Sequence, residues 1–182
     1  MKATIDKGSK LLRKESGFTL IEMLIVVIVL GILAMIIIPQ VAVSTEDAKL
    51  NTLSTNLSAL RNAVELYYHQ HDSKYPGSTK HTDGAATASD AEAIAAIVPQ
   101  LTQFTDVDGE VSTTKVDPYI YGPYLKKETL PTNPYNNKND ITADYDENDI
   151  TARDSTGEDF GWKFYPVTGV LIAADGNTHN DL

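Results

Sequence analysis

The amino-acid sequence predicts an α+β protein in which one long N-terminal helix packs on a small C-terminal antiparallel sheet. An apolar run covers residues 18–38, and a stripe of apolar residues with helical spacing follows it. Near the C-terminus, residues 160–173 place aromatic and aliphatic residues in two short runs separated by a Pro- and Gly-containing turn. A length of 182 residues suits one domain plus a membrane segment.

The apolar run has the length and composition of a membrane helix. Among residues 18–38, only Glu22 carries a charge, and the run is apolar on all sides. A helix of this length extends about 31 Å, and the hydrocarbon core of a bilayer is roughly 30 Å thick. We therefore expect residues 18–39 to form a transmembrane helix.

Glu22 is the unusual residue of this run. A carboxylate inside an apolar span costs about 2.5–3.5 kcal/mol on insertion scales. Either Glu22 lies close enough to the helix end to reach the interface, or it pairs with a positive group. The span itself contains no Lys, Arg or His. A positive partner would therefore come from a chain terminus or from another subunit.

Residues 14–22 read Lys-Glu-Ser-Gly-Phe-Thr-Leu-Ile-Glu. This run resembles the prepilin processing motif of type IV pilins and type II secretion pseudopilins. The resemblance implies that a membrane-bound prepilin peptidase cuts between Gly17 and Phe18 and then methylates the new amino group of Phe18. It also implies that Glu22 pairs with the terminal amine of a neighbouring subunit during filament assembly, and that the first helix kinks at Pro39. The resemblance is close over the N-terminal part of the chain and loose beyond it.

The charges before the span indicate its orientation. Residues 1–17 hold five Lys or Arg against two Asp or Glu, a net charge of +3, whereas the whole chain carries −10. Positive charge beside a span stays in the cytoplasm. We expect a cleaved cytoplasmic leader over 1–17, a transmembrane and filament-core helix over 18–39, and a pilin-like globular domain over 40–182. The expected location is the bacterial inner membrane, and later a periplasmic or extracellular filament.

The helix is expected to continue beyond the membrane to about residue 69. Apolar residues recur there at alternating steps of three and four, which predicts an amphipathic helix packed on the globular domain; they are Leu50, Leu53, Leu57, Leu60, Val64 and Tyr67. His69 and His71 are two positions apart and cannot share a helix face as metal ligands. We interpret both histidines as surface residues at the helix end.

Three features are expected between the helix and the acidic segment. Ser89 and Glu92 have the spacing of a capping box and predict the start of a short helix. Asp108-Gly109 between apolar residues suggests a small hairpin. Residues 117–137, rich in Tyr and Pro, are expected to extend over the domain with their rings packed. The alternative is that these tyrosines bind sugars or bases.

Residues 139–159 are strongly acidic. One interpretation is a solvated loop that keeps the protein soluble. The other is a calcium loop, because Ca²⁺ prefers six to eight oxygen ligands, and the ligands would include Asp144, Asp146 and Asp159. The glycine and glutamate positions of an EF-hand are missing. Residues 155–159 only loosely resemble the sequence near the calcium site of major pseudopilins. No other cofactor is expected.

The C-terminal residues 160–173 resemble the last hairpin of pilin-like proteins, which packs on the amphipathic half of the long helix. The polar tail beyond residue 174 is expected to be mobile. The chain has no cysteine, whereas many major pilins close their C-terminal loop with a disulfide. Pseudopilins and cysteine-free pilins fit this composition better.

The sequence contains no enzyme signature among the common catalytic motifs, and the excess negative charge disfavours nucleic-acid binding. We therefore predict a structural subunit of a type IV pilus or a type II secretion pseudopilus. Its expected partners are other subunits, the prepilin peptidase, an inner-membrane assembly platform and the membrane. Two alternatives stay open: a minor pilin that binds a surface or a substrate, and a single-pass membrane enzyme.

Overall fold

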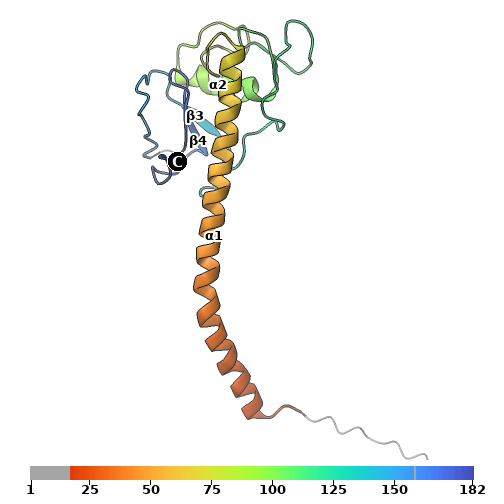
Figure 1. The fold of residues 1–182 in the computed structure, drawn as a ribbon, viewed down its shortest axis with the longest axis vertical. Coiled ribbons are helices and arrows are strands. Elements are labelled where there is room, and N and C mark those ends of the chain that lie inside the picture. The colour runs from red at the N-terminus through yellow and green to blue at the C-terminus, as the bar shows by residue number, and fades with distance from the viewer. Residues whose placement is uncertain (1–16, 158) are drawn as a thin grey trace, which may run out of the picture. The chain divides into compact units, whose positions relative to one another are not determined.

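The computed structural model describes residues 17–157 and 159–182, and the side chains of residues 38–43 are not described. The predicted leader therefore lies, apart from Gly17, outside the described residues. The chain divides into two compact units, Met1–Thr45 and Glu46–Leu182. The helix α1 (Leu20–Gln70) belongs to both units (Figure 1). Its bounds confirm the predicted long helix. Its backbone is helical through Pro39, and a kink there stays a prediction.

The C-terminal half of α1 buries the predicted apolar stripe. Five of its residues, here called the buried stripe, are at most 1% exposed; they are Leu53, Leu57, Leu60, Val64 and Tyr67. The prediction was wrong for Leu50, which is 39% exposed. Leu50 lies one turn before the first buried member of the stripe, and burial on this face begins at Leu53. Apolar residues can recur with helical spacing beyond the point where another part of the protein covers the helix. The pattern therefore included Leu50, which lies outside the packed region.

The short helix α2 (Asp90–Thr102) starts at the predicted capping box. The Ser89 side chain accepts a hydrogen bond from the Glu92 nitrogen, and the Glu92 carboxylate accepts one from the Ala88 nitrogen at 2.8 Å. These bonds satisfy amide groups that the first helical turn leaves without partners. The helix continues through Pro99 for three residues, and the Gln103 nitrogen closes its end on the Pro99 carbonyl.

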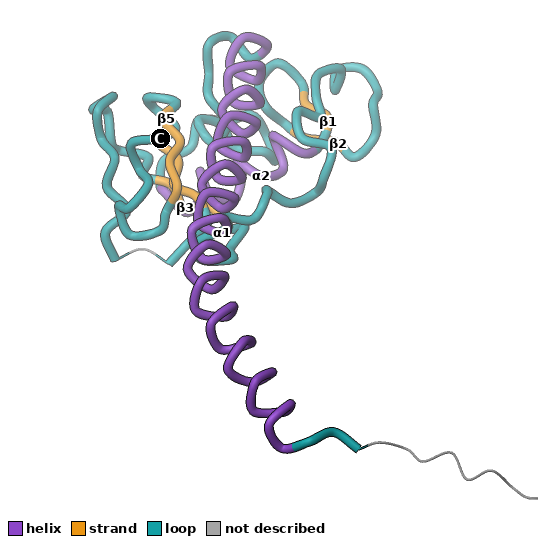
Figure 2. The backbone as a smooth tube through the Cα atoms, turned by 60° about the horizontal axis from the view of Figure 1, so that its bottom comes forward, coloured by secondary structure: helices purple, strands orange, loops and turns teal. Residues whose placement is uncertain are grey.

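Two small sheets complete the globular unit (Figure 2). The strands β1 (Phe104–Thr105) and β2 (Val111–Ser112) form the expected antiparallel hairpin. The second sheet has the order β3-β4-β5, with β3 (Ile141–Ala143), β4 (Trp162–Tyr165) and β5 (Val170–Ala173). The β4–β5 hairpin is antiparallel, as predicted, whereas β3 pairs with β4 in parallel. The sheet is therefore mixed.

Strand β3 corrects the interpretation of residues 139–159 as loop throughout. Ile141 and Ala143 are buried, and Thr142 between them is partly exposed. The strand aligns Ile141 with Trp162. A strand of three residues is too short to show a convincing alternation in the sequence, and the acidic residues around it obscured the signal.

His71 is buried, which contradicts its prediction as a surface residue. It is 1% exposed, and its ring stacks on Tyr67 with centroids 3.6 Å apart. The Nδ1 atom lies 2.8 Å from the Tyr67 carbonyl, and Nε2 lies 2.9 Å from Thr105 Oγ1. Because a carbonyl only accepts, Nδ1 carries the proton in the neutral ring, and Nε2 accepts from Thr105. The chain turns directly after α1 and folds His71 back into the unit.

The polar tail is also held in place, against the prediction that it is mobile. The Arg61 guanidinium donates to the carbonyl oxygens of Leu171 and Leu182, at 2.8 and 2.6 Å from Nη2. His179 stacks against Tyr135 with ring centroids 3.9 Å apart. The sequence of the tail is polar and lacks apolar periodicity, so it did not predict packing. Hydrogen bonds and one ring contact, not apolar burial, hold the tail on the unit.

Candidate functional site

The predicted processing site lies directly before α1. Gly17 and Phe18 lie outside any helix or strand, and Phe18 is 80% exposed. A Cβ atom added to Gly17 would meet no atom within 4 Å. The peptide bond between these two residues is therefore sterically open within the described part of the chain.

Thr19 and Glu22 form a reciprocal cap at the first turn of α1. The Glu22 carboxylate accepts from the Thr19 nitrogen at 2.7 Å and from the Thr19 hydroxyl at 2.8 Å. The Glu22 nitrogen in turn approaches the same hydroxyl oxygen at 3.3 Å. This is the geometry of a capping box, which places acceptors at the positive end of the helix dipole. The sequence reasoning about Glu22 missed this local role, although the Thr-x-x-Glu spacing was visible.

The first half of α1 has the properties of one membrane span. Residues Leu20–Ile37 are long and apolar enough to cross a bilayer, and none of their side chains is buried within the protein. Gln, Asn, Lys and Arg are absent from this stretch. A single N-terminal span is therefore consistent with membrane anchoring.

The three carboxylates considered as calcium ligands do not form a cluster. The Asp144 backbone nitrogen donates a hydrogen bond to the carbonyl of Phe164 in β4, and Asp146 is exposed. Asp159 pairs with Lys138, with 2.5 Å between Nζ and Oδ2. Across residues 17–157 and 159–182, no three His, Asp or Glu side chains converge as metal ligands. The donors present do not fit a calcium ion in this arrangement, and calcium binding stays a prediction.

Asn177 fastens the tail to the segment before β4. It adopts a left-handed conformation, with φ of 67°, and its Oδ1 accepts from the nitrogen and hydroxyl of Ser155. Its Nδ2 donates to Asp154 Oδ1 at 2.9 Å and to Thr156 Oγ1 at 2.6 Å. Hydrogen bonds from Asn177, the largest cause, and from Thr156 lower the pKa of Asp154 to about 2. The Asn177 side-chain amide therefore forms hydrogen bonds with three consecutive residues, 154–156.

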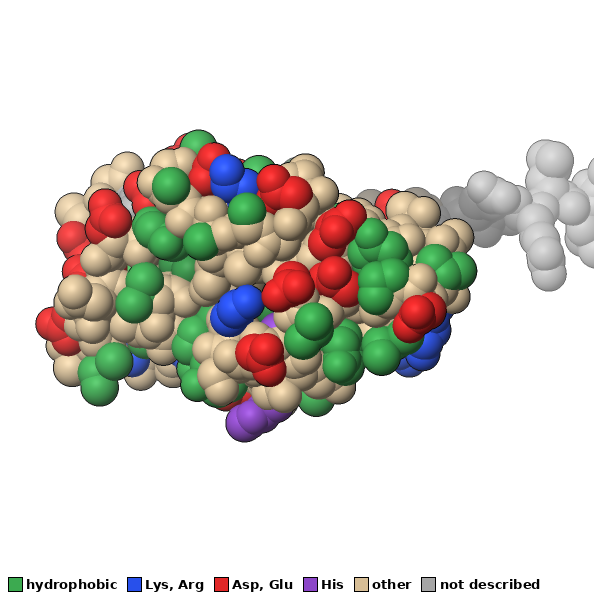
Figure 3. Space-filling view, turned by 90° about the horizontal axis from the view of Figure 1, so that it is seen from above, with side chains coloured by type: hydrophobic (Ala, Val, Ile, Leu, Met, Phe, Trp, Pro, Cys, Tyr) green, Lys and Arg blue, Asp and Glu red, His purple; other side chains and the backbone are tan. Residues whose placement is uncertain are grey.

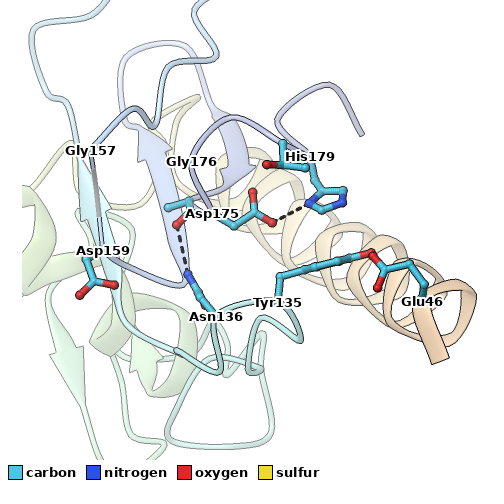
Figure 4. A pocket seen from close by; sticks show the side chains of 10 residues that line it. Glu46, Tyr135, Asn136, Gly157, Asp159, Asp175, Gly176 and His179 are labelled. Carbon is cyan, nitrogen blue, oxygen red and sulfur yellow. Dashed lines mark hydrogen bonds and ion pairs between the residues drawn. The ribbon is translucent and has the colours of Figure 1, made fainter. Parts of the chain in front are cut away.

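A cavity of about 700 Å³ lies beside this tail (Figure 4). His179 Nδ1 lies 2.6 Å from Asp175 Oδ2, and the His179 ring lies against Tyr135. Burial, followed by the neighbouring Glu46 carboxylate, raises the pKa of Tyr135. The sequence had suggested no site here, because its residues are spread from α1 to the tail. The contacts hold the tail on the domain.

The tyrosines considered for binding sugars or bases contribute to packing. Tyr119, Tyr121 and Tyr124 are partly buried. The Tyr124 hydroxyl donates to Gln70 at 2.7 Å, and the Tyr119 hydroxyl donates to Glu110 at 2.8 Å. The chain as a whole carries a net charge of −10, and Asp and Glu side chains are prominent on the face shown in Figure 3. This arrangement favours packing over recognition of an anionic polymer.

The N-terminal segment is similar to known proteins. Residues 12–38 match the prokaryotic N-terminal methylation motif. The type II secretion system core protein G of Pseudomonas aeruginosa is 42% identical over 55 residues, which are 30% of this chain and 39% of the relative. The protein of the same name from Vibrio cholerae is 41% identical over 58 residues, 32% and 40% of the two chains. Over this segment, the chain is similar to type II secretion core proteins G and carries the methylation motif.

The same segment is also similar to a fimbrial protein. A fimbrial protein of Pseudomonas aeruginosa is 43% identical over 54 residues, 30% of this chain and 35% of the relative. The chain thus spans less than half the length of each of these three relatives. No solved structure matches the chain. The similarity to these relatives therefore lies in the N-terminal part of the chain.

Proposed function

We propose that this pilin-like chain is processed by a prepilin peptidase and polymerises through α1 into a type IV pilus or a type II secretion pseudopilus. One observation carries the proposal. The methylation motif lies at a sterically open peptide bond directly before the unburied stretch Leu20–Ile37, which is apolar except for Glu22 in its first turn. A hydrophobic surface of this extent needs a partner, and lipid and other copies of the same helix both supply one.

Cleavage after Gly17 would create the charged amine that Glu22 lacks within its own span. In a stack of subunits, the amine of one Phe18 would meet the Glu22 carboxylate of its neighbour. An ion pair with good hydrogen-bond geometry offsets the cost of burying both charges, whereas one buried charge alone is strongly unfavourable. The pair would therefore select one axial register between neighbouring helices.

The topology follows from the charges of the leader. Its Lys and Arg residues would keep the leader in the cytoplasm, where the peptidase would reach the bond between Gly17 and Phe18. The globular unit would lie on the outer side. An inner-membrane assembly platform would then lift the subunit from the bilayer into the filament, exchanging lipid contacts for helix contacts.

Mass spectrometry of assembled material tests this function. The mature protein should begin at Phe18 and carry a methyl group on its new amine, and electron microscopy of overexpressing cells should show filaments. Long retractile fibres would indicate a pilus, and short fibres would indicate a pseudopilus. Gly17→Val should leave an uncleaved precursor in the membrane, because a branched side chain next to the bond would hinder the approach of the peptidase. Filaments that retain Met1 would contradict the proposal.

A further inference from the structure

Ile150 is an isolated apolar side chain on an acidic surface. It is 69% exposed, more than any other large apolar residue described within Glu46–Leu182. Asp149 directly precedes it and Asp146 lies three residues further back, and both are exposed. A single exposed apolar residue is common on protein surfaces, so exposure alone says little. The fixed backbone and the acidic neighbours of Ile150 suggest a more specific role.

The backbone that carries Ile150 is fixed by local hydrogen bonds. The Ala152 nitrogen donates to the Asp149 carbonyl at 3.0 Å and closes a turn with Ile150 at its first central position. The Asp149 carboxylate accepts from the nitrogen and hydroxyl of Thr151 at 2.8 and 2.7 Å. Arg153 donates to the Ile150 carbonyl at 3.0 Å. The polar groups of the turn are thus bonded to one another, while the Ile150 side chain extends into solvent.

An apolar groove with two lysines lies elsewhere on the same unit. It has a volume of about 230 Å³, and Ala59 of α1, Leu125 and Pro131 supply its apolar lining. Lys126 and Lys127 also line it, and both are exposed. Among the residues that the structure describes, no carboxylate forms an ion pair with either lysine. The groove therefore suits an apolar side chain with acidic neighbours.

The turn and the groove lie on opposite flanks of α1. The groove is lined by Asn56 and Ala59, whereas Arg153, at the end of the turn, lines a different cavity with Arg61 and Glu65. At about 100° per residue, Asn56 and Ala59 fall on one side of the buried stripe, and Arg61 and Glu65 fall on the other. One copy consequently cannot fill its own groove, but a parallel copy beside it presents the missing surface.

We propose that Ile150 of one copy docks in the Lys126–Lys127 groove of a second copy, with Asp146 and Asp149 facing the two lysines. Charge complementarity between the two surfaces identifies the occupant as another copy, since both halves of the contact belong to one chain. The contact joins different surfaces on opposite flanks, so it is heterologous and leaves a free turn and a free groove at the two ends. It therefore propagates along a filament. This inference rests on the proposed function and adds a contact between the globular units.

Crosslinking in assembled filaments tests the contact, because the chain has no natural cysteine. The full-length chain is produced in its own host with Ile150→Cys and Ala59→Cys together, and a short bis-maleimide is added. A ladder of dimers, trimers and longer products is expected. Mixing the two single variants should give dimers only, whereas each single variant alone should give none. The matched control replaces Ile150→Cys by Val167→Cys, a side chain that is 51% exposed and lies outside the contact, and should give no ladder.

Substitutions test the energetics of the same contact. Ile150→Ser should lower filament yield about tenfold, the factor expected when most of an isoleucine is no longer buried, and Val167→Ser should leave the yield unchanged. Lys126→Glu and Asp146→Lys should each lower the yield, and the two together should restore it.

The outcomes separate this contact from the proposed function. A wild-type chain that forms no filament overturns both. Wild-type filaments that give no ladder, or that form at full yield with Ile150→Ser, overturn the contact alone. Crosslinks between Ile150→Cys and a different protein only, or homodimers of a single variant, also overturn it.

Discussion

The Glu22 carboxylate accepts two hydrogen bonds from Thr19, from the backbone nitrogen at 2.7 Å and from Oγ1 at 2.8 Å. One side chain thus closes the first turn of α1 and supplies the charge proposed to meet a neighbour's amine. Substitutions that treat the two roles separately can distinguish them.

Glu22→Gln keeps an acceptor oxygen for Thr19 and removes the charge. We expect normal membrane insertion and cleavage and a loss of filaments, because the incoming amine would be buried without a partner. Glu22→Val should behave in the same way and should also insert more easily. Thr19→Val keeps the charge and loses only the hydroxyl bonds, at a cost of about 1 kcal/mol, so it should still assemble. Quantitative immunoblots of membrane and filament fractions measure each effect. Wild-type levels of filaments from Glu22→Val would remove the central step of the assembly proposal.

Buried His71 predicts a loss of stability in mild acid. Burial, the largest effect, lowers its pKa below the ordinary value of 6.5, while Asp106 opposes this shift. The folded state therefore binds the proton less readily than the unfolded state. Stability is complete above pH 6.5 and falls as the pH drops below it, by up to about 1.4 kcal/mol per pH unit, until the folded-state pKa is passed.

Urea unfolding of a fragment that begins at Ser44, measured between pH 5 and 8 (roughly the range in which histidine titrates), checks this dependence. His71→Gln should flatten the loss of stability below pH 6.5. The control is His69→Gln, since His69 is exposed two positions away, and it should retain the wild-type slope. Equal slopes in the wild type and His71→Gln would contradict the assignment to His71.

Asn177 should contribute more to stability than its exposed surroundings suggest. Asn177→Ala removes the side-chain bonds to three residues and takes away the oxygen that accepts from the nitrogen and hydroxyl of the fully buried Ser155, whose Oγ keeps only the bond from the Asn177 backbone nitrogen. We therefore expect a loss of about 2–3 kcal/mol in the free energy of unfolding. Asn137→Ala is the matched control, because Asn137 has a similar φ of 59° and an exposed side chain. It isolates the backbone cost, about 1 kcal/mol or less. Similar losses in both variants would assign the effect to the backbone.

The bonds of Asn177 to residues 154–156, here called the Asn177 clasp, predict a second effect in strong acid. The pKa of Asp154 is lowered to about 2 from its ordinary value of 3.8, chiefly by Asn177. This bonding contributes stability above pH 3.8, which is lost as the pH falls from there toward 2. In Asn177→Ala, this part of the acid profile should shrink, as measured by thermal unfolding over that range.

Calcium binding by residues 139–159 can be tested directly. The carboxylates do not converge in the described structure, so any binding would have to rearrange the segment and break the Lys138–Asp159 pair. If calcium does bind, millimolar Ca²⁺ should raise the melting temperature of the fragment relative to chelator, by linkage. An unchanged melting temperature would assign the segment to a solvated loop around β3.

The parts of the fold that the sequence predicted are those with a repeated local pattern. The buried stripe, the Ser89–Glu92 cap and the β4–β5 hairpin each depend on residues close together in the chain. His71, β3 and Asn177 were missed because their partners are distant in the sequence: Thr105, Trp162 and Ser155. At the candidate site, the motif predicts roles for Gly17, Phe18 and Glu22, and these stay predictions. The Thr19–Glu22 cap was missed, although its Thr-x-x-Glu spacing is present in the sequence.

The Asn177 clasp and the β4–β5 hairpin also determine when the globular unit can close. Both lie about 90 residues or more beyond the end of α1, and Arg61 of α1 bonds to the carbonyl of Leu182. A ribosome adds about 5–20 residues per second, so these residues emerge many seconds after α1. The apolar half of α1 is therefore complete well before the other half acquires the sheet against which it packs. The globular unit consequently cannot close until residues up to 177 have been made, and removal of the residues from 175 onward should leave it open.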